Sequence, residues 1–475
     1  MLFPTITFAI FFMIVLPLSW LLMPRPVHWK LFMLAASYYF YGYWNWQFVL
    51  LIAASTVGNQ ILGRLIHRSE DERARRGLLA LAVVGNLGVL GYFKYYDFFV
   101  TSAVNTLDSV GLNLSPEIVS ITLPIGISFF TFQALSYVID IYRRSFEPVT
   151  MLEFAVYLSF FPHLVAGPIV RAAEFLPQLR ERHDPRRVDA SRAFFLIGLG
   201  LFKKVVIANF VATEIVDQVF ASPDRHSSFE VLIGVYAYAV QIYADFSGYT
   251  DMAIGLALLI GFRFPQNFDG PYTSVSLQDF WRRWHMTLSR WLRDYLYIPL
   301  GGNRGTNLQT YRNLMLTMLI GGLWHGAAWT FVVWGGIHGG GLSFEHWRRQ
   351  RREAAGLPEP PDTVWRRTGA RIITFNIVCL AWVFFRATSF DNAFEVLGRL
   401  FGHWGEPSPA VTLSLLFVVA IGIGGQYIPK PAMGRAMAWF SRLSPVAQGA
   451  ALGLLLLVTN TLGPRGVAPF IYFQF

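Results

Sequence analysis

Charge and cysteine are scarce in this sequence. Only 14% of the 475 residues are charged, whereas 54% are hydrophobic and 16% aromatic, and the mean hydropathy is +0.42. Soluble domains carry about 25% charged residues, so the composition excludes a disordered chain, a coiled coil and an ordinary soluble enzyme. The single cysteine, Cys379, excludes an intrachain disulfide and a cysteine-rich metal site. We therefore expect an all-α polytopic membrane protein.

The net charge is nevertheless +10. In a soluble protein such an excess suggests nucleic-acid binding, but here the arginine clusters lie between apolar runs, as in the cytoplasmic loops of membrane proteins. We expect a lipid bilayer and no nucleic acid as partner. The segment Met1–Met23 has no basic residue before its apolar run and no small-residue cleavage pattern after it, so we expect a retained span rather than a removable signal peptide.

Eleven apolar segments are candidates for the ~20-residue helices that cross a bilayer, although several are short and others are long enough to break in the middle. A further segment, Leu152–Val170, contains Pro162, His163 and Pro168, so a re-entrant segment and a crossing are both open. The eleven candidates are Leu2–Met23, Lys30–Tyr43, Phe48–Leu62, Leu78–Val100, Ile118–Tyr142, Ala193–Phe220, Phe229–Phe262, Asn313–Phe344, Ile372–Phe385, Val411–Tyr427 and Ala447–Thr461.

The basic loops predict an orientation, because lysine and arginine gather on the cytoplasmic side of a membrane. The early loops alternate between basic and non-basic, which places the N-terminus outside. Residues Arg263–Arg312 and Arg348–Arg371 are then both cytoplasmic, so the glycine-rich segment between them, residues 313–344, must enter and return. We expect one integral membrane domain over residues 1–475, with a basic interfacial segment at 263–312 and a catalytic hairpin at 313–344.

Histidines near this hairpin are the sharpest candidates for chemistry. His325 lies within the hairpin in GGLWHG, His338 follows in WGGIHG, and His285 precedes the hairpin in FWRRWH. Imidazole transfers protons near neutral pH, and acyl transfer to a hydroxyl needs a base because an alcohol is a weak nucleophile. His325 would be that base and His285 a donor that polarises a thioester carbonyl. A buried histidine bonded to a backbone carbonyl is the alternative for all three. Their spacing matches no metal-ligand pattern, so we expect no metal.

The stretch before the hairpin interleaves aromatic residues with arginines. Trp281, Trp284, Trp291 and Tyr295 fall near one face of a helix whose other positions carry arginine, which predicts an interfacial amphipathic helix. Its arginines are either a membrane anchor or a site for an anionic cytosolic donor.

Asp245 and Asp251 lie inside an apolar run and need partners. Lys203 and Lys204 could pair with the aspartates or lie at the cytoplasmic interface. A buried network that braces the fold and a role at the site are both open for the two aspartates.

Together these motifs resemble the membrane-bound O-acyltransferase (MBOAT) family. The resemblance rests on DFWRRWHMTLSRWLRDYLYIPLGGNRG and GGLWHGAAWTFVVWGGIHG, with PIGISFFTFQALSYVIDIYR, FFPHLVAGPIVR and YADFSGYTDMAIG matching the bacterial branch typified by the alginate O-acetyltransferase membrane subunit. It implies a ring of about eleven transmembrane helices with re-entrant segments around a central tunnel. It also implies that His325 and His285 are catalytic and lie within that tunnel.

The resemblance further implies a multi-pass protein of the inner (cytoplasmic) membrane that takes acetyl from a cytosolic thioester, acetyl-CoA, with no permanently bound cofactor. An SGNH-hydrolase-like extracytoplasmic partner would place the acetyl group on an exported polysaccharide. D-alanyl transfer to teichoic acid from a carrier protein, or proton-coupled transport without bond-making, are the alternatives. We expect His325 as general base or transient acyl acceptor, His285 as the second catalytic residue, and substrate contacts from Trp324, Trp281, Trp284, Arg283, Asp245 and Asp251.

Overall fold

The computed structural model describes residues 1–112, 121–165, 167–462 and 470–471, and all regular secondary structure within these ranges is helical. The first residues of one expected span, Ile118–Ser120, lie outside the described residues. Contacts divide the chain into two compact units, residues 1–189 with 256–264 and residues 190–255 with 265–475. The expectation of a single domain remains a prediction.

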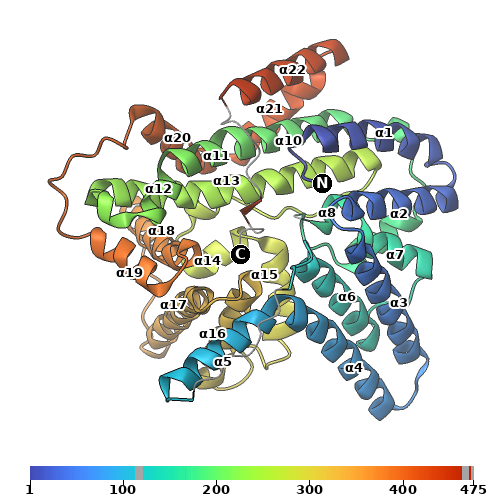
Figure 1. The fold of residues 1–475 in the computed structure, drawn as a ribbon, viewed down its shortest axis with the longest axis horizontal. Helices are drawn as coiled ribbons and strands as arrows, with labels where there is room; N and C mark the ends of the chain where they lie inside the picture. Colours follow the sequence, from blue (N-terminus) through green and yellow to red (C-terminus); the bar gives the residue numbers. More distant parts are fainter. Residues whose placement is uncertain (113–120, 166, 463–469, 472–475) are drawn as a thin grey trace. The chain divides into compact units, whose positions relative to one another are not determined.

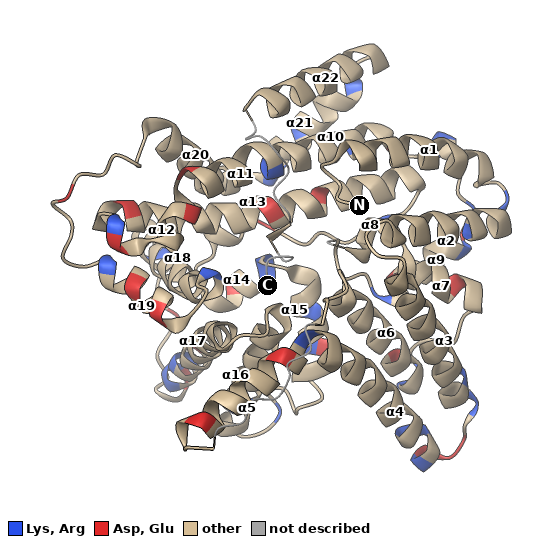
Figure 2. Ribbon diagram, viewed as in Figure 1, with Lys and Arg blue, Asp and Glu red and all other residues tan. Residues whose placement is uncertain are grey.

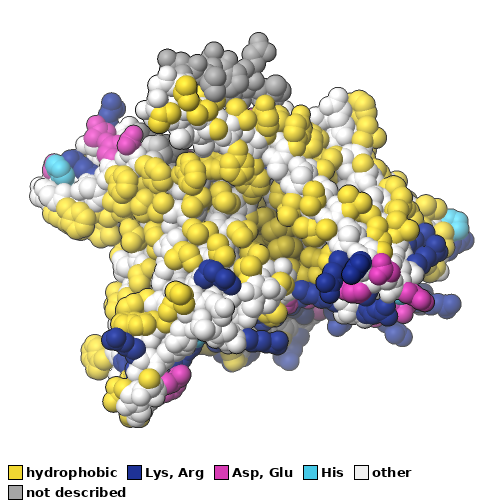
Figure 3. Space-filling model, turned by 90° about the horizontal axis from the view of Figure 1, so that it is seen from below, with side chains coloured by type: hydrophobic (Ala, Val, Ile, Leu, Met, Phe, Trp, Pro, Cys, Tyr) yellow, Lys and Arg dark blue, Asp and Glu magenta, His cyan; other side chains and the backbone are white. Residues whose placement is uncertain are grey.

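Among the described residues, six helices are long and apolar enough to cross a membrane, or seven if one bent pair counts as a span. Large apolar side chains on these and neighbouring helices are exposed: Met13 is 74%, Phe417 66% and Leu454 62% accessible. Figure 3 shows such side chains spread over much of one face, with charged side chains in few places. Hydrocarbon, which needs no hydrogen bonds, is the environment that suits this surface. The protein is therefore a multi-pass membrane protein, while the number of eleven spans and the tunnel remain predictions.

In the first unit, α3, α4 and α6 pack against one another, and α2 and α3 both contact α7 (Figure 1). Asp71 begins α4 by accepting hydrogen bonds from the backbone N–H groups of Arg73 and Ala74. His163, the histidine between two prolines, is fully buried, and its Nε2 lies 2.9 Å from the carbonyl oxygen of Tyr157. The helices are α1 (Ile6–Leu22), α2 (Pro26–Gly42), α3 (Gln47–Arg68), α4 (Glu72–Leu90), η1 (Gly91–Tyr95), α5 (Tyr96–Ser109), α6 (Ile127–Tyr142), α7 (Met151–Ser159), α8 (Phe161–Leu164), α9 (Ala172–Arg180) and η2 (Pro185–Arg187).

The second unit begins with a helical run that π-helical turns interrupt. Its helices are α10 (Ala190–Leu201), η3 (Phe202–Ala208), α11 (Asn209–Val211), η4 (Ala212–Val216), α12 (Asp217–Ala221), η5 (Pro223–Arg225) and the long α13 (Ser228–Ile260), whose last turn clusters with the first unit. Gly200 and Gly248 let this run approach α13 closely, because a Cβ added at Gly200 would lie 2.5 Å from the Gly248 carbonyl oxygen.

The rest of the second unit carries the histidines. Its helices are η6 (Pro271–Thr273), α14 (Leu277–Arg283), α15 (Met286–Leu292), η7 (Arg293–Tyr297), α16 (Asn307–His325), α17 (Trp329–Ala354), α18 (Val364–Arg386), α19 (Phe390–Arg399), α20 (Leu413–Gly424), η8 (Gly425–Tyr427), α21 (Lys430–Arg442) and α22 (Pro445–Leu462).

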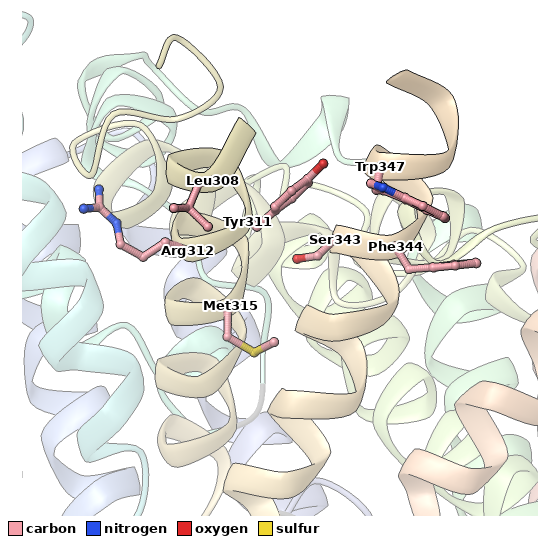
Figure 4. Close-up of a pocket in the computed structure, with 7 residues that line it drawn as sticks. All are labelled: Leu308, Tyr311, Arg312, Met315, Ser343, Phe344 and Trp347. Carbon is pink, nitrogen blue, oxygen red and sulfur yellow. The ribbon is translucent and has the colours of Figure 1, made fainter. Parts of the chain in front are cut away.

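Helices α16 and α17 occupy the segment that was predicted to enter and return. They are separated by Gly326–Ala328 and pack closely along their length, since a Cβ at Gly322 would lie 2.2 Å from the Phe331 carbonyl oxygen. At the end of the pair remote from His325, an apolar groove of about 440 Å³ opens between the two helices (Figure 4). Its walls include Leu308 and Met315 of α16 and Phe344 of α17, and none of the candidate catalytic histidines lines it.

The prediction of one continuous interfacial helix through residues 281–295 is wrong. The helix ends at Arg283 and restarts at Met286, because His285 adopts a left-handed conformation with φ 41°. Trp284 is fully buried and packs 5.0 Å from the ring of Trp382, so its contacts are with protein rather than lipid. Helical spacing alone could not reveal this break, since the tertiary contacts of residues 284 and 285 produce it.

Candidate active site

His325 is the last residue of α16 and lies where the chain turns toward α17. Its side chain is 3% exposed. The imidazole is enclosed by aromatic rings: its centroid lies 5.0 Å from that of Trp334, 5.3 Å from Phe385 and 4.8 Å from the adjacent Trp324. The glycines around the turn let α16 and α17 approach closely enough to form this enclosure.

His285 lies at the break between α14 and α15 and is fully buried. Its ring centroid is 6.5 Å from that of His325 and 6.0 Å from that of Trp324. The structure thus brings together the two histidines that were predicted to be catalytic, although they come from different helices. Helices α14 and α15 have seven residues each, too few to span a bilayer. Burial lowers the pKa of the His285 imidazole to about 3, so the ring is neutral at physiological pH.

A buried asparagine that the sequence analysis missed holds His285. Asn267 is fully buried, and its Oδ1 lies 3.2 Å from His285 Nδ1, 3.1 Å from the Thr287 backbone nitrogen and 2.9 Å from Thr287 Oγ1. The backbone oxygen of Asn267 also accepts a hydrogen bond of 2.9 Å from Met286 N. Asn267 lies in the loop QNFDG, and no local motif marks it. Only the fold brings it to the His285 ring.

The predicted tryptophans surround the histidines in different ways. Trp324 contacts both rings. Trp281 is half-buried, and its Nε1 donates a hydrogen bond of 3.3 Å to Nδ1 of His338. Trp284 packs against Trp382, whose ring lies 5.9 Å from Trp334. Aromatic walls of this kind exclude water from the histidine pair, while substrate contact by these three tryptophans stays a prediction.

The three charged residues predicted to bind substrate are each engaged in ion pairs. Arg283 Nε lies 2.8 Å from Asp279 Oδ1. Asp251 pairs with Lys203 at 2.7 Å and Asp245 with Lys204 at 2.8 Å, so the lysines proposed as partners do pair with the aspartates. Figure 2 shows acidic residues of α13 close to basic residues of the preceding helical run. Both aspartate pairs brace the packing of η3 against α13, and their contact with substrate remains a prediction.

Asp245 is also linked to the histidines through its neighbour. The ring of Phe246 lies edge-on to His285, with centroids 4.7 Å apart. Asp245 Oδ2 accepts a hydrogen bond of 2.9 Å from the backbone N–H of Ile471.

Within the described parts of the chain, no group of three or more His, Cys, Asp or Glu side chains is arranged to hold a metal ion.

Comparison with known proteins identifies the family of this chain. The sequence profile of the membrane-bound O-acyltransferase family (MBOAT) matches residues 83–389. This chain belongs to that family and is an acyltransferase.

The relatives that match most of this chain include three with different names. The chain is 41% identical to "Probable alginate O-acetylase AlgI" of Azotobacter vinelandii, over 94% of each chain, and 38% identical to "Peptidoglycan O-acetyltransferase" of Helicobacter pylori, over 80% of this chain and 75% of the relative. It is 30% identical to "Teichoic acid D-alanyltransferase" of Streptococcus thermophilus, over 71% of this chain and 85% of the relative.

Proposed function

We propose that this chain is a membrane O-acetyltransferase that moves acetyl groups from a cytosolic thioester to an exported polysaccharide. The two most similar of the relatives above carry names for O-acetylation of alginate and of peptidoglycan, at 41% and 38% identity. Both names describe glycans outside the cytoplasm, which supports the substrate class. Membership of an acyltransferase family removes the support for a transporter without bond-making chemistry.

The pairing of His285 with His325, at 6.5 Å between ring centroids, is the observation that carries this proposal. In the reaction, an acceptor hydroxyl attacks the acyl carbon of the thioester, the O–H bond breaks as the O–C bond forms, and the C–S bond then breaks. The proton passes from the hydroxyl through an imidazole to the leaving thiolate. His325 is the proposed base or transient acyl acceptor, and His285 the second catalytic group.

Acetyl-CoA is the proposed donor, and the chain's basic loops suit an anionic coenzyme. We place the protein in the inner (cytoplasmic) membrane, where a cytosolic donor and an exported acceptor lie on opposite sides. An SGNH-hydrolase-like extracytoplasmic partner is proposed to complete the transfer to the polysaccharide. Trp324, Trp281, Trp284, Arg283, Asp245 and Asp251 stay proposed substrate contacts.

A second candidate is D-alanyl transfer to teichoic acid, which the 30% identity to a teichoic acid D-alanyltransferase favours. The identity to the O-acetylating relatives is higher, so acetyl transfer is the first choice. Inside-out membrane vesicles from cells expressing the chain separate the two candidates. They are supplied with acetyl-labelled acetyl-CoA, or with labelled D-alanine on a carrier protein.

Ester-linked labelled acetate on extracted glycan, absent from vesicles with H325A, is the expected result. Transfer of labelled D-alanine without labelled acetate would favour the second candidate. Neither label in ester linkage, with the protein present and folded, would overturn the proposed function.

A further inference from the structure

We propose that Asn267 is a positioning residue that fixes the tautomer of His285 and makes its Nε2 a proton acceptor. This role is the opposite of the one predicted for His285 from the sequence, that of a donor polarising a carbonyl. The catalytic role of Nε2 rests on the proposed acyl transfer, but the tautomer of His285 can be measured without any activity.

The hydrogen bonds of Asn267 determine which ring nitrogen carries the proton. Its side-chain atom at 3.1 Å from Thr287 N must be an oxygen, because a backbone N–H only donates. The same oxygen lies 3.2 Å from His285 Nδ1. An amide oxygen only accepts, so Nδ1 carries the hydrogen and donates it. The neutral ring therefore keeps a lone pair on Nε2.

Asn267 also holds the backbone that presents this ring. Its main-chain oxygen accepts from Met286 N, and its Oδ1 accepts from Thr287 N, so one residue binds three consecutive residues of the break. His285 has φ 41°, a left-handed conformation that is costly for a residue with a Cβ. Such a conformation persists only where the surroundings hold it in place. Asn267 supplies that restraint.

Among the described residues, Nε2 of His285 has no protein partner, and the atom is buried. The rings around His285 include those of Phe246, Trp324 and His325, at 4.7, 6.0 and 6.5 Å between centroids. A buried acceptor without a partner is costly to a fold unless a ligand uses it. A hydroxyl of the acetyl acceptor would supply the missing hydrogen.

In the proposed reaction, His285 Nε2 takes the proton of the attacking hydroxyl as the O–C bond forms. The proton returns to the leaving group as the bond from the acyl carbon to its carrier breaks. The carrier is the imidazole of His325, which acts here as the transient acyl acceptor and takes the acetyl group from the donor thioester in the preceding step. The low pKa of His285 keeps Nε2 unprotonated before each turnover.

His338 provides an internal reference, because its hydrogen bond selects the opposite tautomer. The indole N–H of Trp281 donates to His338 Nδ1 at 3.3 Å. An indole nitrogen only donates, so the neutral ring of His338 carries its hydrogen on Nε2. The two buried histidines are thus expected in opposite tautomers.

The direct test is nuclear magnetic resonance of the full chain in lipid, with ring-labelled histidine. The signals that disappear in H285Q and in H338Q identify the two residues. We expect the His285 ring protonated at Nδ1 and the His338 ring at Nε2. In N267A the His285 signal should lose its Nδ1–H pattern while that of His338 is unchanged. A wild-type His285 protonated at Nε2 would overturn the proposal, whatever the activity of the protein.

Kinetics separate positioning from mere support of the fold. N267A should lower kcat by on the order of 10²-fold, the contribution of a general base, with a much smaller change in KM for the donor. N267D keeps an oxygen for all three donors and should restore most of kcat. Its carboxylate favours protonated His285, so the acid limb of the pH profile should move to higher pH.

The matched control is N86A, which removes another buried asparagine. Asn86 Nδ2 donates to Asn59 Oδ1 at 2.7 Å in the first unit. N86A should lower the unfolding temperature without changing kcat per folded molecule. If N267A behaves like N86A, or if N267D is as inactive as N267A with an unmoved pH profile, the positioning role is contradicted. Inactive wild-type protein with the expected tautomers would instead count against the proposed function.

Discussion

The rings of His285 and His325 lie 6.5 Å apart between centroids, one at the break between α14 and α15 and the other at the end of α16. Both are nearly or fully buried, and Trp324 contacts both. This spacing places the two imidazoles near each other in a region that water reaches poorly. Proton transfer needs that proximity, because a base must lie within hydrogen-bond reach of the proton it takes.

Replacing His325 by alanine should abolish ester-linked acetylation of the glycan, with a loss on the order of 10²-fold or more. The substitution removes the imidazole that takes a proton or an acyl group, while the enclosing rings of Trp334 and Phe385 remain. Acetyl-labelled acetyl-CoA supplied to membrane vesicles measures the effect.

His403 offers the matched control for H325A. It lies on the surface, where its Nδ1 is 2.7 Å from Glu406 Oε1. H403A should keep wild-type activity and membrane insertion. Full activity of H325A, with equal amounts of protein in the membrane, would remove His325 from the mechanism.

The packing of α16 against α17 should depend on Gly335 and not on its neighbour Gly336. A Cβ at Gly335 would lie 2.3 Å from the backbone oxygen of Met318, whereas the nearest atom to a Cβ at Gly336 is 3.9 Å away. G335A must push the helices apart, at a cost of about 1–3 kcal/mol. It should also displace His325 and lower activity.

G336A should keep activity, since alanine fits there and favours the helix by up to about 1 kcal/mol. Thermal unfolding in detergent and acetylation assays on both variants provide the comparison. Equal behaviour of G335A and G336A would contradict the proposed role of close packing.

The sequence predicted the parts of this fold that depend on local pattern. Apolar runs marked helices such as α3 and α18, and the basic loops on both sides of residues 313–344 predicted a segment that turns back. The need to neutralise buried charge predicted that Lys203 and Lys204 pair with the aspartates of α13. These predictions rest on periodicity and hydropathy, which can be read from a few turns of helix, and on the pairing of opposite charges.

The sequence could not predict what tertiary contacts impose. Helical spacing predicted one continuous helix through residues 281–295. The chain breaks instead at His285, whose left-handed conformation Asn267 stabilises from a preceding loop. No local sequence motif marks Asn267. The direction of the His285 hydrogen bond, and hence its tautomer, depends on a single distant amide. The family resemblance identified the histidine pair, but not the residue that orients it.

Breaking the Lys204–Asp245 pair should destabilise the second unit strongly. Both side chains are almost fully buried, at 2% and 3% exposure, so K204M leaves a carboxylate without its cation. Loss of one partner of a buried pair costs about 3–5 kcal/mol. The double variant K204M/D245N removes both charges and should recover much of the loss.

The Lys203–Asp251 pair gives the comparison for this prediction. Its side chains are 18% and 19% exposed. K203M should therefore cost less than K204M. Unfolding temperatures of the purified variants in detergent measure both effects, and a larger loss in K203M would contradict the ranking.

The first unit should lose stability in acid through Glu153. Lys30 Nζ lies 2.9 Å and Arg180 Nη2 3.3 Å from its carboxylate, and the N–H of Thr150 donates to it at 3.1 Å. Burial alone would raise the pKa of Glu153, but these partners outweigh burial and lower it from 4.5 to about 2. A pKa that folding lowers contributes stability that is complete above the unfolded value and is lost as the pH falls toward the folded value.

E153Q should therefore be less stable than the wild type at pH 6, and the difference should shrink as the pH falls from about 4.5 toward 2. Unfolding temperatures of both proteins across that range, in one detergent, measure the difference. Glu147 provides the control, since it is exposed and E147Q should match the wild type throughout. A difference between E153Q and the wild type that stays constant down to pH 3 would mean that Lys30 and Arg180 do not stabilise the Glu153 carboxylate.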